Sequence, residues 1–207
     1  MSDLWLLENE IYASGVSCLC GVDEAGRGPL AGPVCAAAVM LPRGLDIPGL
    51  NDSKKLTEKK REELYNIICA GAVCYGVAFA GVEEIERLNI LNATFLAMNR
   101  AIAQLSVPPQ LALIDGNRDS GIEKPSRCIV KGDALCADIA AASVLAKVTR
   151  DRYMTALASE YPQYGFEKHK GYETRAHDEA LLAHGPCPIH RMSFLKKFYE
   201  KHPEAPR

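Results

Sequence analysis

The chain alternates between short apolar runs and longer amphipathic stretches. Short apolar runs typical of buried strands occur at 19–23, 34–41, 73–81, 111–114 and 128–130. Leu91, Phe95, Met98, Ile102 and Leu105 recur every three or four residues, which predicts an amphipathic helix. A stretch rich in alanine, from residue 134 to about residue 158, predicts a second long helix.

Capping residues and glycines mark further elements. Thr57 is a typical N-cap for a helix that Gly71 ends, and short helical segments are expected from Thr174 and from Ile189. Three strands followed by helix, strand, strand and helix form an α/β or mixed pattern around one sheet. Without a repeat, linker or low-complexity segment, one domain covering residues 1–207 is the simplest interpretation.

Composition narrows the class of protein. With 48% apolar and 24% charged residues and a net charge of −2, the chain has the mix of an ordinary soluble protein. Its longest apolar runs, such as 34–41, are too short to span a membrane, and residues 1–15 lack the basic residues of a signal peptide. The eight cysteines form no C-x-x-C pair, so we expect reduced thiols in a cytoplasmic protein.

Carboxylates stand where several apolar runs end. Asp23 and Glu24, Asp115 and Asp133 each follow a short apolar run and precede a turn or helix start. Strand ends often converge on one cleft, and four carboxylates there repel one another unless a cation lies between them. Mg²⁺ and Mn²⁺ prefer such oxygen ligands, and two ions can assist phosphodiester hydrolysis. The five histidines lie near the C-terminus without zinc-type spacing.

Asp138 is an alternative to Asp133, since both lie near the start of the long alanine-rich helix. Five positions separate them, so they need not share a face of the helix. Asp133 is the preferred ligand because it stands at the strand-to-helix junction, where the helix dipole also favours an acid. A simple helix cap remains the alternative interpretation of Asp133.

Six motifs occur in an order that resembles bacterial ribonuclease HII. They are DEAGRGPLAGPV (23–34), DSKKL (52–56), DGN (115–117), KGD (131–133), AASVLAKVTRD (141–151) and HKGY (169–172). Each motif is weak by itself, whereas six in one order are specific. The resemblance covers about residues 18–200.

The resemblance implies a ribonuclease H-like α/β fold: a central mixed five-stranded sheet flanked by helices, with a small helical C-terminal extension over about residues 160–207. It implies that Asp23, Glu24, Asp115 and Asp133 are catalytic and bind Mg²⁺ or Mn²⁺. The implied reaction is cleavage of RNA in RNA–DNA hybrids and 5′ to single ribonucleotides embedded in duplex DNA. It leaves 3′-hydroxyl and 5′-phosphate ends and would serve ribonucleotide removal and RNA primer processing.

The same resemblance implies how substrate is recognised. Gly26, Arg27 and Gly28 would sense the 2′-hydroxyl through backbone groups, and Tyr172 would pack beside the ribose. Ser143 could bind a phosphate or its own helix carbonyl. The candidates for phosphate contacts are Lys54 and Lys147, with Lys55, Lys168 and Lys170 as further possibilities. The expected partners are RNA–DNA hybrid and ribonucleotide-containing DNA. We expect the protein to be a monomer and not to bind a membrane.

Three other functions fit parts of the pattern. A ribonuclease HIII-like protein typically carries lysine where Arg27 stands and an extra N-terminal domain, while fewer than twenty residues precede the first strand here. A catalytically silent hybrid-binding module would not need all four acids. A Rossmann-type nucleotide binder would share Gly26 and Gly28 but needs a third glycine and a helix next, which Pro29 and Pro33 disfavour.

Overall fold

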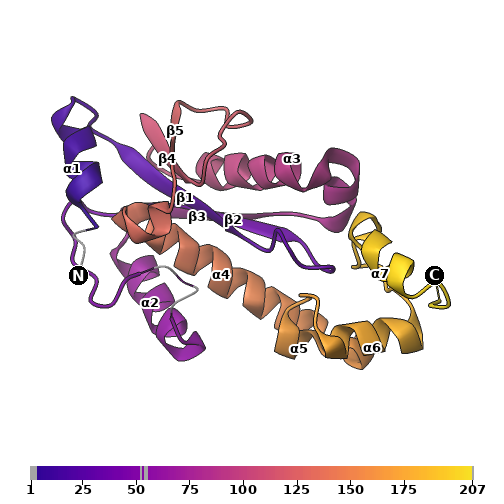
Figure 1. The fold of residues 1–207 in the computed structure, drawn as a ribbon. Coiled ribbons are helices and arrows are strands. Elements are labelled where there is room, and N and C mark those ends of the chain that lie inside the picture. The colour runs from indigo at the N-terminus through magenta and orange to yellow at the C-terminus, as the bar shows by residue number, and fades with distance from the viewer. Residues whose placement is uncertain (1–3, 52, 54–55, 207) are drawn as a thin grey trace.

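The computed structural model describes residues 4–51, 53 and 56–206 and contains one mixed five-stranded sheet in the order β3-β2-β1-β4-β5 (Figure 1). Strands β1, β2 and β3 pair antiparallel, whereas β4 pairs parallel to β1 and β5 pairs parallel to β4. The strands are β1 (Leu19–Ala25), β2 (Val34–Met40), β3 (Cys74–Ala80), β4 (Leu111–Asp115) and β5 (Ser126–Ile129). The predicted mixed sheet is therefore confirmed.

Helices cover both faces of the sheet. Figure 1 shows α3 on one face and α2 and α4 on the other. The helices are α1 (Leu6–Ala13), α2 (Glu58–Gly71), α3 (Val82–Ala103), α4 (Ala137–Leu157), α5 (Phe166–His169), α6 (Arg175–His184) and α7 (Lys196–Lys201). Across the described ranges, no helix is both long enough and apolar enough to cross a membrane.

Alternation along β1 divides its side chains between the two faces. Cys20 and Val22 belong to the core that α3 closes, while Leu19 packs on the α4 side. Gly21 also faces α4, and a Cβ built on it would lie 2.1 Å from the backbone nitrogen of Ile139. The absence of a side chain at Gly21 thus lets α4 lie directly against the strand.

Helix ends follow the capping signals in the sequence. The Thr57 side chain accepts a hydrogen bond from Lys60 N–H, which confirms it as the N-cap of α2. Helix α3 is kinked at Asn89 (φ 68°), whose Oδ1 accepts from Leu91 N–H at 3.0 Å. The predicted apolar stripe begins at Leu91 because a new helical segment is capped there.

One helix was not expected, and two local expectations need correction. Helix α1 was not predicted from the sequence, although it buries Glu8 and Ile11. Strand β1 continues to Ala25, so the first two acids lie within the strand rather than after it. Helix α4 begins at Ala137, and Asp133 lies in a 3₁₀ turn, Gly132–Ala134, before it. The helix-dipole argument for Asp133 is therefore wrong.

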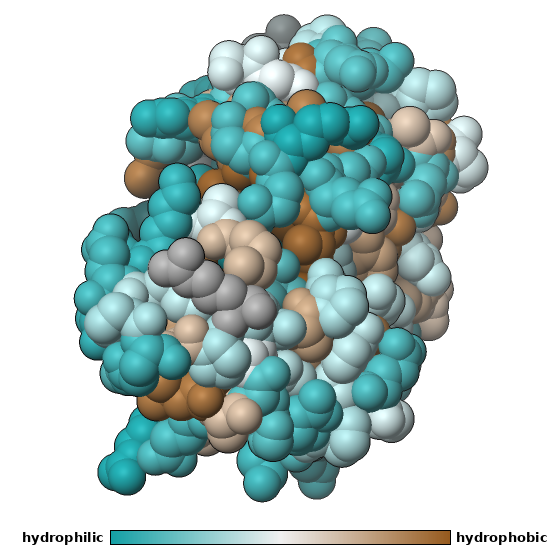
Figure 2. Space-filling view, turned by 90° about the vertical axis from the view of Figure 1, so that its right-hand side faces the viewer, coloured by the Kyte–Doolittle hydropathy of each residue, from teal (hydrophilic) through white to brown (hydrophobic). Residues whose placement is uncertain are grey.

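The C-terminal segments add a helical layer beyond the sheet, as predicted for the extension. Helices α5, α6 and α7 surround an apolar cluster that also takes in residues from α4 and from the β1–β2 connection. Figure 2 faces this end of the molecule, where hydrophilic residues predominate and apolar ones are scattered. The main members of the cluster are Leu30, Ala31, Met154, Leu157, Phe166, Leu181, Leu195 and Phe198.

Candidate active site

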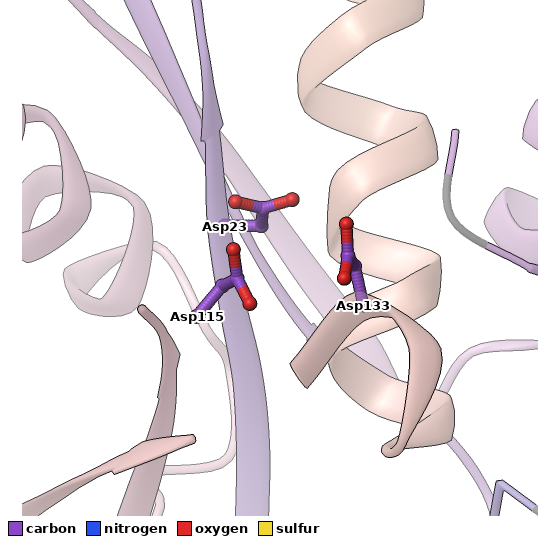
Figure 3. Close-up of side chains that lie close together, drawn as sticks. All are labelled: Asp23, Asp115 and Asp133. Carbon is purple, nitrogen blue, oxygen red and sulfur yellow. The ribbon is translucent and has the colours of Figure 1, made fainter. Parts of the chain in front are cut away.

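Parallel pairing of β1 with β4 brings two of the predicted acids together. Leu19 pairs with Leu111 and Val22 with Ile114, so the next positions, Asp23 and Asp115, end the paired segment side by side. Strand alternation directs both side chains to the face that α4 covers. Asp133 reaches the same place from the turn before α4, and Figure 3 shows the three carboxylates pointing toward one another.

The three aspartates have the arrangement of a metal site. Asp23, Asp115 and Asp133 each offer one oxygen, and these atoms all lie within 4.8 Å of one another. Asp23 and Asp133 are only 4% and 6% exposed, so their mutual repulsion is poorly screened by water. An all-oxygen donor set suits a hard divalent cation, and the residues therefore fit the expected Mg²⁺ or Mn²⁺.

Backbone groups orient two of these carboxylates. Glu24 N–H donates to Asp23 Oδ1 at 2.7 Å, and Gly132 N–H donates to Asp115 Oδ1 at 2.7 Å. A Cβ on Gly132 would lie 2.5 Å from the Ile139 side chain and 3.3 Å from Asp115 Oδ1. Glycine at this position therefore lets the turn approach Asp115 closely.

Glu24 lies beside the three-aspartate cluster but is not part of it. Its Oε1 lies 3.3 Å from an Arg27 guanidinium nitrogen. Glu24, Arg27 and Asp115 line one cavity of about 370 Å³, which Arg118 also borders. Sequence reasoning missed Arg118, although its place directly after the DGN motif was a usable signal.

Asp138 has a different environment from the cluster. It is fully buried, its Oδ1 accepts from Leu41 N–H at 2.9 Å, and its own N–H donates to Glu8 Oε1 at 3.0 Å. Burial and the nearby Glu8 carboxyl raise the pKa of Asp138. Asp138 thus joins α4 to α1 and to the residue that follows β2, and the metal-ligand geometry selects Asp133 instead.

The two predicted ribose-contacting segments lie next to each other. Gly26 adopts φ +94°, a left-handed conformation that glycine tolerates. A Cβ on Gly28 would lie 3.9 Å from Cε1 of Tyr172, whose side chain is 40% exposed. The fold therefore forms one small surface from the 26–28 loop and the tyrosine.

The other substrate candidates differ in placement. Lys147 Nζ lies 5.8 Å from the Tyr172 ring centroid and forms an ion pair of 2.7 Å with Asp151. Ser143 is buried and donates to Ser53 Oγ at 2.6 Å instead of to its own helix carbonyl, and its contact with a phosphate stays a prediction. The Lys170 ammonium donates to the Glu167 carbonyl, and Lys168 is exposed. Lys54 and Lys55 lie outside the described residues.

Two further observations concern alternative sites. Strand β1 is followed by the antiparallel strand β2 and not by a helix, which excludes the Rossmann interpretation of Gly26 and Gly28. A larger cavity of about 630 Å³, lined by Gly32, Glu83 and Tyr153 among others, contains none of the three clustered aspartates. The 370 Å³ cavity, by contrast, is lined by Asp115 together with Glu24 and Arg27.

The chain matches a known family over most of its length. A family model described as Ribonuclease HII matches residues 20–197. A protein from Dechloromonas aromatica (strain RCB) named Ribonuclease HII is 58% identical over 179 residues, covering 86% of this chain and 91% of that protein.

Solved structures show the same fold. The ribonuclease H2 from Pyrococcus horikoshii OT3 superposes with a TM-score of 0.72 at 27% identity, covering 90% of this chain and 99% of that one. Bst-RNase HIII in complex with Mn²⁺ superposes with a TM-score of 0.63 at 20% identity, covering 81% of this chain and 63% of that one. At 20% identity, the second likeness establishes the fold alone.

Proposed function

The chain belongs to the ribonuclease HII family, and on this premise we propose that it cuts duplex DNA 5′ to single embedded ribonucleotides as well as RNA–DNA hybrids, leaving 3′-hydroxyl and 5′-phosphate ends. Its family membership makes it a ribonuclease H, an enzyme class that depends on divalent metal and acts on RNA–DNA hybrids. The finer specificity would serve ribonucleotide removal from DNA and RNA primer processing.

The observation that carries the proposal is the convergence of Asp23, Asp115 and Asp133 within 4.8 Å. These three would hold Mg²⁺ or Mn²⁺, with Glu24 as the fourth ligand. When bound, a pair of such ions supplies charge stabilisation for the attacking and leaving oxygens of a phosphodiester. The protein's own contribution is to hold the carboxylates in place, through the Glu24 and Gly132 N–H groups and the β1–β4 pairing.

Substrate selection would rest on the surface formed by Gly28 and Tyr172. A 2′-hydroxyl both donates and accepts hydrogen bonds, and backbone groups of the 26–28 loop can supply partners for it. The tyrosine ring would pack against the ribose. Arg27 and Arg118 both border the 370 Å³ cavity beside Asp115, where their charge suits a phosphate.

Replacement of Asp115 by asparagine tests the metal assignment. We expect Asp115→Asn to fold and to bind hybrid duplex but to lose cleavage, by at least about 1000-fold, because the cluster loses an anionic ligand. Asp119→Asn is the matched control, since Asp119 lies on the following loop and accepts from Ser126 Oγ. Full activity of Asp115→Asn in Mg²⁺ would contradict the assignment.

Mapping the cut on a duplex with one embedded ribonucleotide tests the specificity. We expect a single cut 5′ to the ribonucleotide, with ends that a ligase and a phosphatase distinguish. Cleavage restricted to long hybrids would instead favour the specificity of a ribonuclease HIII-like enzyme.

We also propose that the protein acts as a monomer, because one chain supplies every proposed metal ligand. Light scattering measures the molar mass in solution and so tests the monomer directly.

A further inference from the structure

Arg191, far along the chain from the 26–33 loop, binds that loop from inside the protein. Its guanidinium donates to the carbonyl oxygens of Gly26 at 2.6 Å, Arg27 at 2.9 Å and Gly32 at 2.8 Å. Its backbone N–H also donates to the Leu30 carbonyl at 2.8 Å. One residue therefore holds both ends of the loop that contains the proposed 2′-hydroxyl sensor.

These contacts set the direction of two peptide groups. In a planar trans peptide, the N–H points opposite to the C=O of the preceding residue. With the Gly26 and Arg27 carbonyls turned inward to Arg191, the N–H groups of Arg27 and Gly28 point away from it. Within the described part of the chain, neither N–H has a hydrogen-bond acceptor, so both are available to a ligand.

Arg150, on α4, holds the remainder of the same loop. It donates to the carbonyls of Pro33 at 3.0 Å, Ala31 at 3.2 Å and Lys170 at 3.0 Å. Its guanidinium carbon also lies 5.7 Å from the centroid of the Tyr172 ring. Arg150 thus connects the loop to the segment that carries the tyrosine.

A chain of hydrogen bonds joins the residue before Arg191 to Tyr172. Cys187 N–H donates to His190 Nδ1 at 2.9 Å, which leaves the His190 proton on Nε2. His190 Nε2–H then donates to His177 Nε2 at 3.0 Å, and His177 Nδ1–H donates to the Tyr172 carbonyl at 3.0 Å. The dipeptide His190-Arg191 therefore contacts the 26–33 loop directly through Arg191 and is linked to the Tyr172 carbonyl through His177.

Burying the guanidinium groups of Arg150 and Arg191 costs free energy, so a gain in stability does not by itself explain these two residues. Arg150 and Arg191 are both 0% exposed, and burial together with repulsion from Arg150 lowers the pKa of Arg191 to about 9. Apolar residues of similar volume often stabilise a core as well as or better than buried charges. Two buried guanidinium groups aimed at the carbonyls of one loop instead indicate that the loop's shape matters for function.

We propose that Arg191 is a positioning residue for 2′-hydroxyl recognition: its three carbonyl contacts turn the Arg27 and Gly28 N–H groups toward the ribose, while His190 holds the Tyr172 segment in register with them. The inference rests on the proposed function, since it assigns a role within the same substrate site. Neither residue touches the substrate in this proposal.

Binding to matched duplexes tests the role of Arg191. The dissociation constants are measured for a duplex with one ribonucleotide and for its all-DNA equivalent, with Ca²⁺ as the only divalent ion. Lysine cannot reach three carbonyls with one ammonium group, so Arg191→Lys should reduce the preference for the ribonucleotide duplex about tenfold. All-DNA binding should stay unchanged. Arg175→Lys is the control, because Arg175 is 93% exposed on α6.

The outcomes separate the two proposals. A lower melting temperature with an unchanged preference for the ribonucleotide duplex would mean that Arg191 is merely structural and would overturn its assignment as a positioning residue. If the wild-type protein binds the ribonucleotide duplex no more tightly than the all-DNA duplex, the proposed function itself is overturned, and the role of Arg191 with it.

Amide NMR of the wild-type protein decides the matter if Arg191→Lys does not fold. The Arg27 and Gly28 N–H signals should shift with the ribonucleotide duplex beyond any shift with all-DNA duplex. Equal shifts of these two signals with both duplexes would refute the positioning role of Arg191.

Discussion

Replacement of Gly28 by alanine separates the shape of the 26–28 loop from its use. An added Cβ would meet only the Tyr172 ring edge, at 3.9 Å, which is an ordinary van der Waals distance. Alanine in a compatible backbone changes stability by less than about 1 kcal/mol. For a chain of this length, that corresponds to a melting temperature within about 4 °C of wild type.

Cleavage should respond differently from stability. The new methyl group would occupy the space between the loop backbone and the tyrosine, where the ribose is proposed to lie. Losing one or two hydrogen bonds of about 1 kcal/mol each lowers kcat/KM by about 5- to 30-fold on a single-ribonucleotide duplex.

Gly26→Ala provides the contrast. Its Cβ would lie 2.0 Å from Arg150 Nε, at a backbone φ of +94°, so both stability and cleavage should fall. The assay pairs thermal unfolding with kcat/KM for both variants. Wild-type cleavage by a stable Gly28→Ala variant would refute the approach of the ribose to Gly28. An equal loss of melting temperature in both variants would refute the packing argument.

Three further predictions concern packing, pH and the tyrosine. Gly21→Ala should lower the free energy of unfolding in urea by about 3 kcal/mol or more, since its Cβ would lie 2.1 Å from an α4 main-chain nitrogen. Gly71→Ala is the control: its Cβ would meet only a side chain, at 3.4 Å, so the free energy of unfolding should change little. Burial lowers the pKa of His177 and His190 to about 4, so below pH 6.5 the unfolded state binds more protons than the folded state. The free energy of unfolding should therefore fall by about 2 kcal/mol per histidine between pH 7 and pH 5 and stay level above pH 7. A free energy of unfolding that does not change between pH 7 and pH 5 would contradict this prediction. The Tyr172→Ala variant should cut at a lone ribonucleotide about tenfold more slowly than wild type, because the ring no longer packs against the ribose. Its melting temperature should be preserved because Tyr172 is 40% exposed, and the Tyr172→Phe variant should keep most activity. An unchanged cleavage rate in the alanine variant would reject the ribose contact.

Features that depend on neighbouring residues could be predicted from the sequence. Apolar runs located all five strands, and Thr57 and Thr174 each cap the helix that was expected after them. Such signals are short-range, because a cap or a strand is specified within a few residues. The ordered motifs also indicated the family, which the comparisons established.

Features that depend on packing could not be predicted in the same way. Helix α1 has a weak local signal and is held by contacts such as that between Glu8 and the start of α4. Ser143 is an ordinary helix residue until the fold places Ser53 beside it. Arg150 and Arg191 resemble surface arginines in the sequence, and only the tertiary structure buries them against the 26–33 loop.

The candidate metal site shows the division most clearly. The residue types and their positions after apolar runs already indicated carboxylates that share a cation. Their meeting depends on β4 pairing parallel to β1 in a register that places Asp115 beside Asp23, although two strands and two helices separate them along the chain. The choice of Asp133 over Asp138 depends on where the turn before α4 lies. Register and helix placement arise from packing over the whole sheet, which no local pattern of residues encodes.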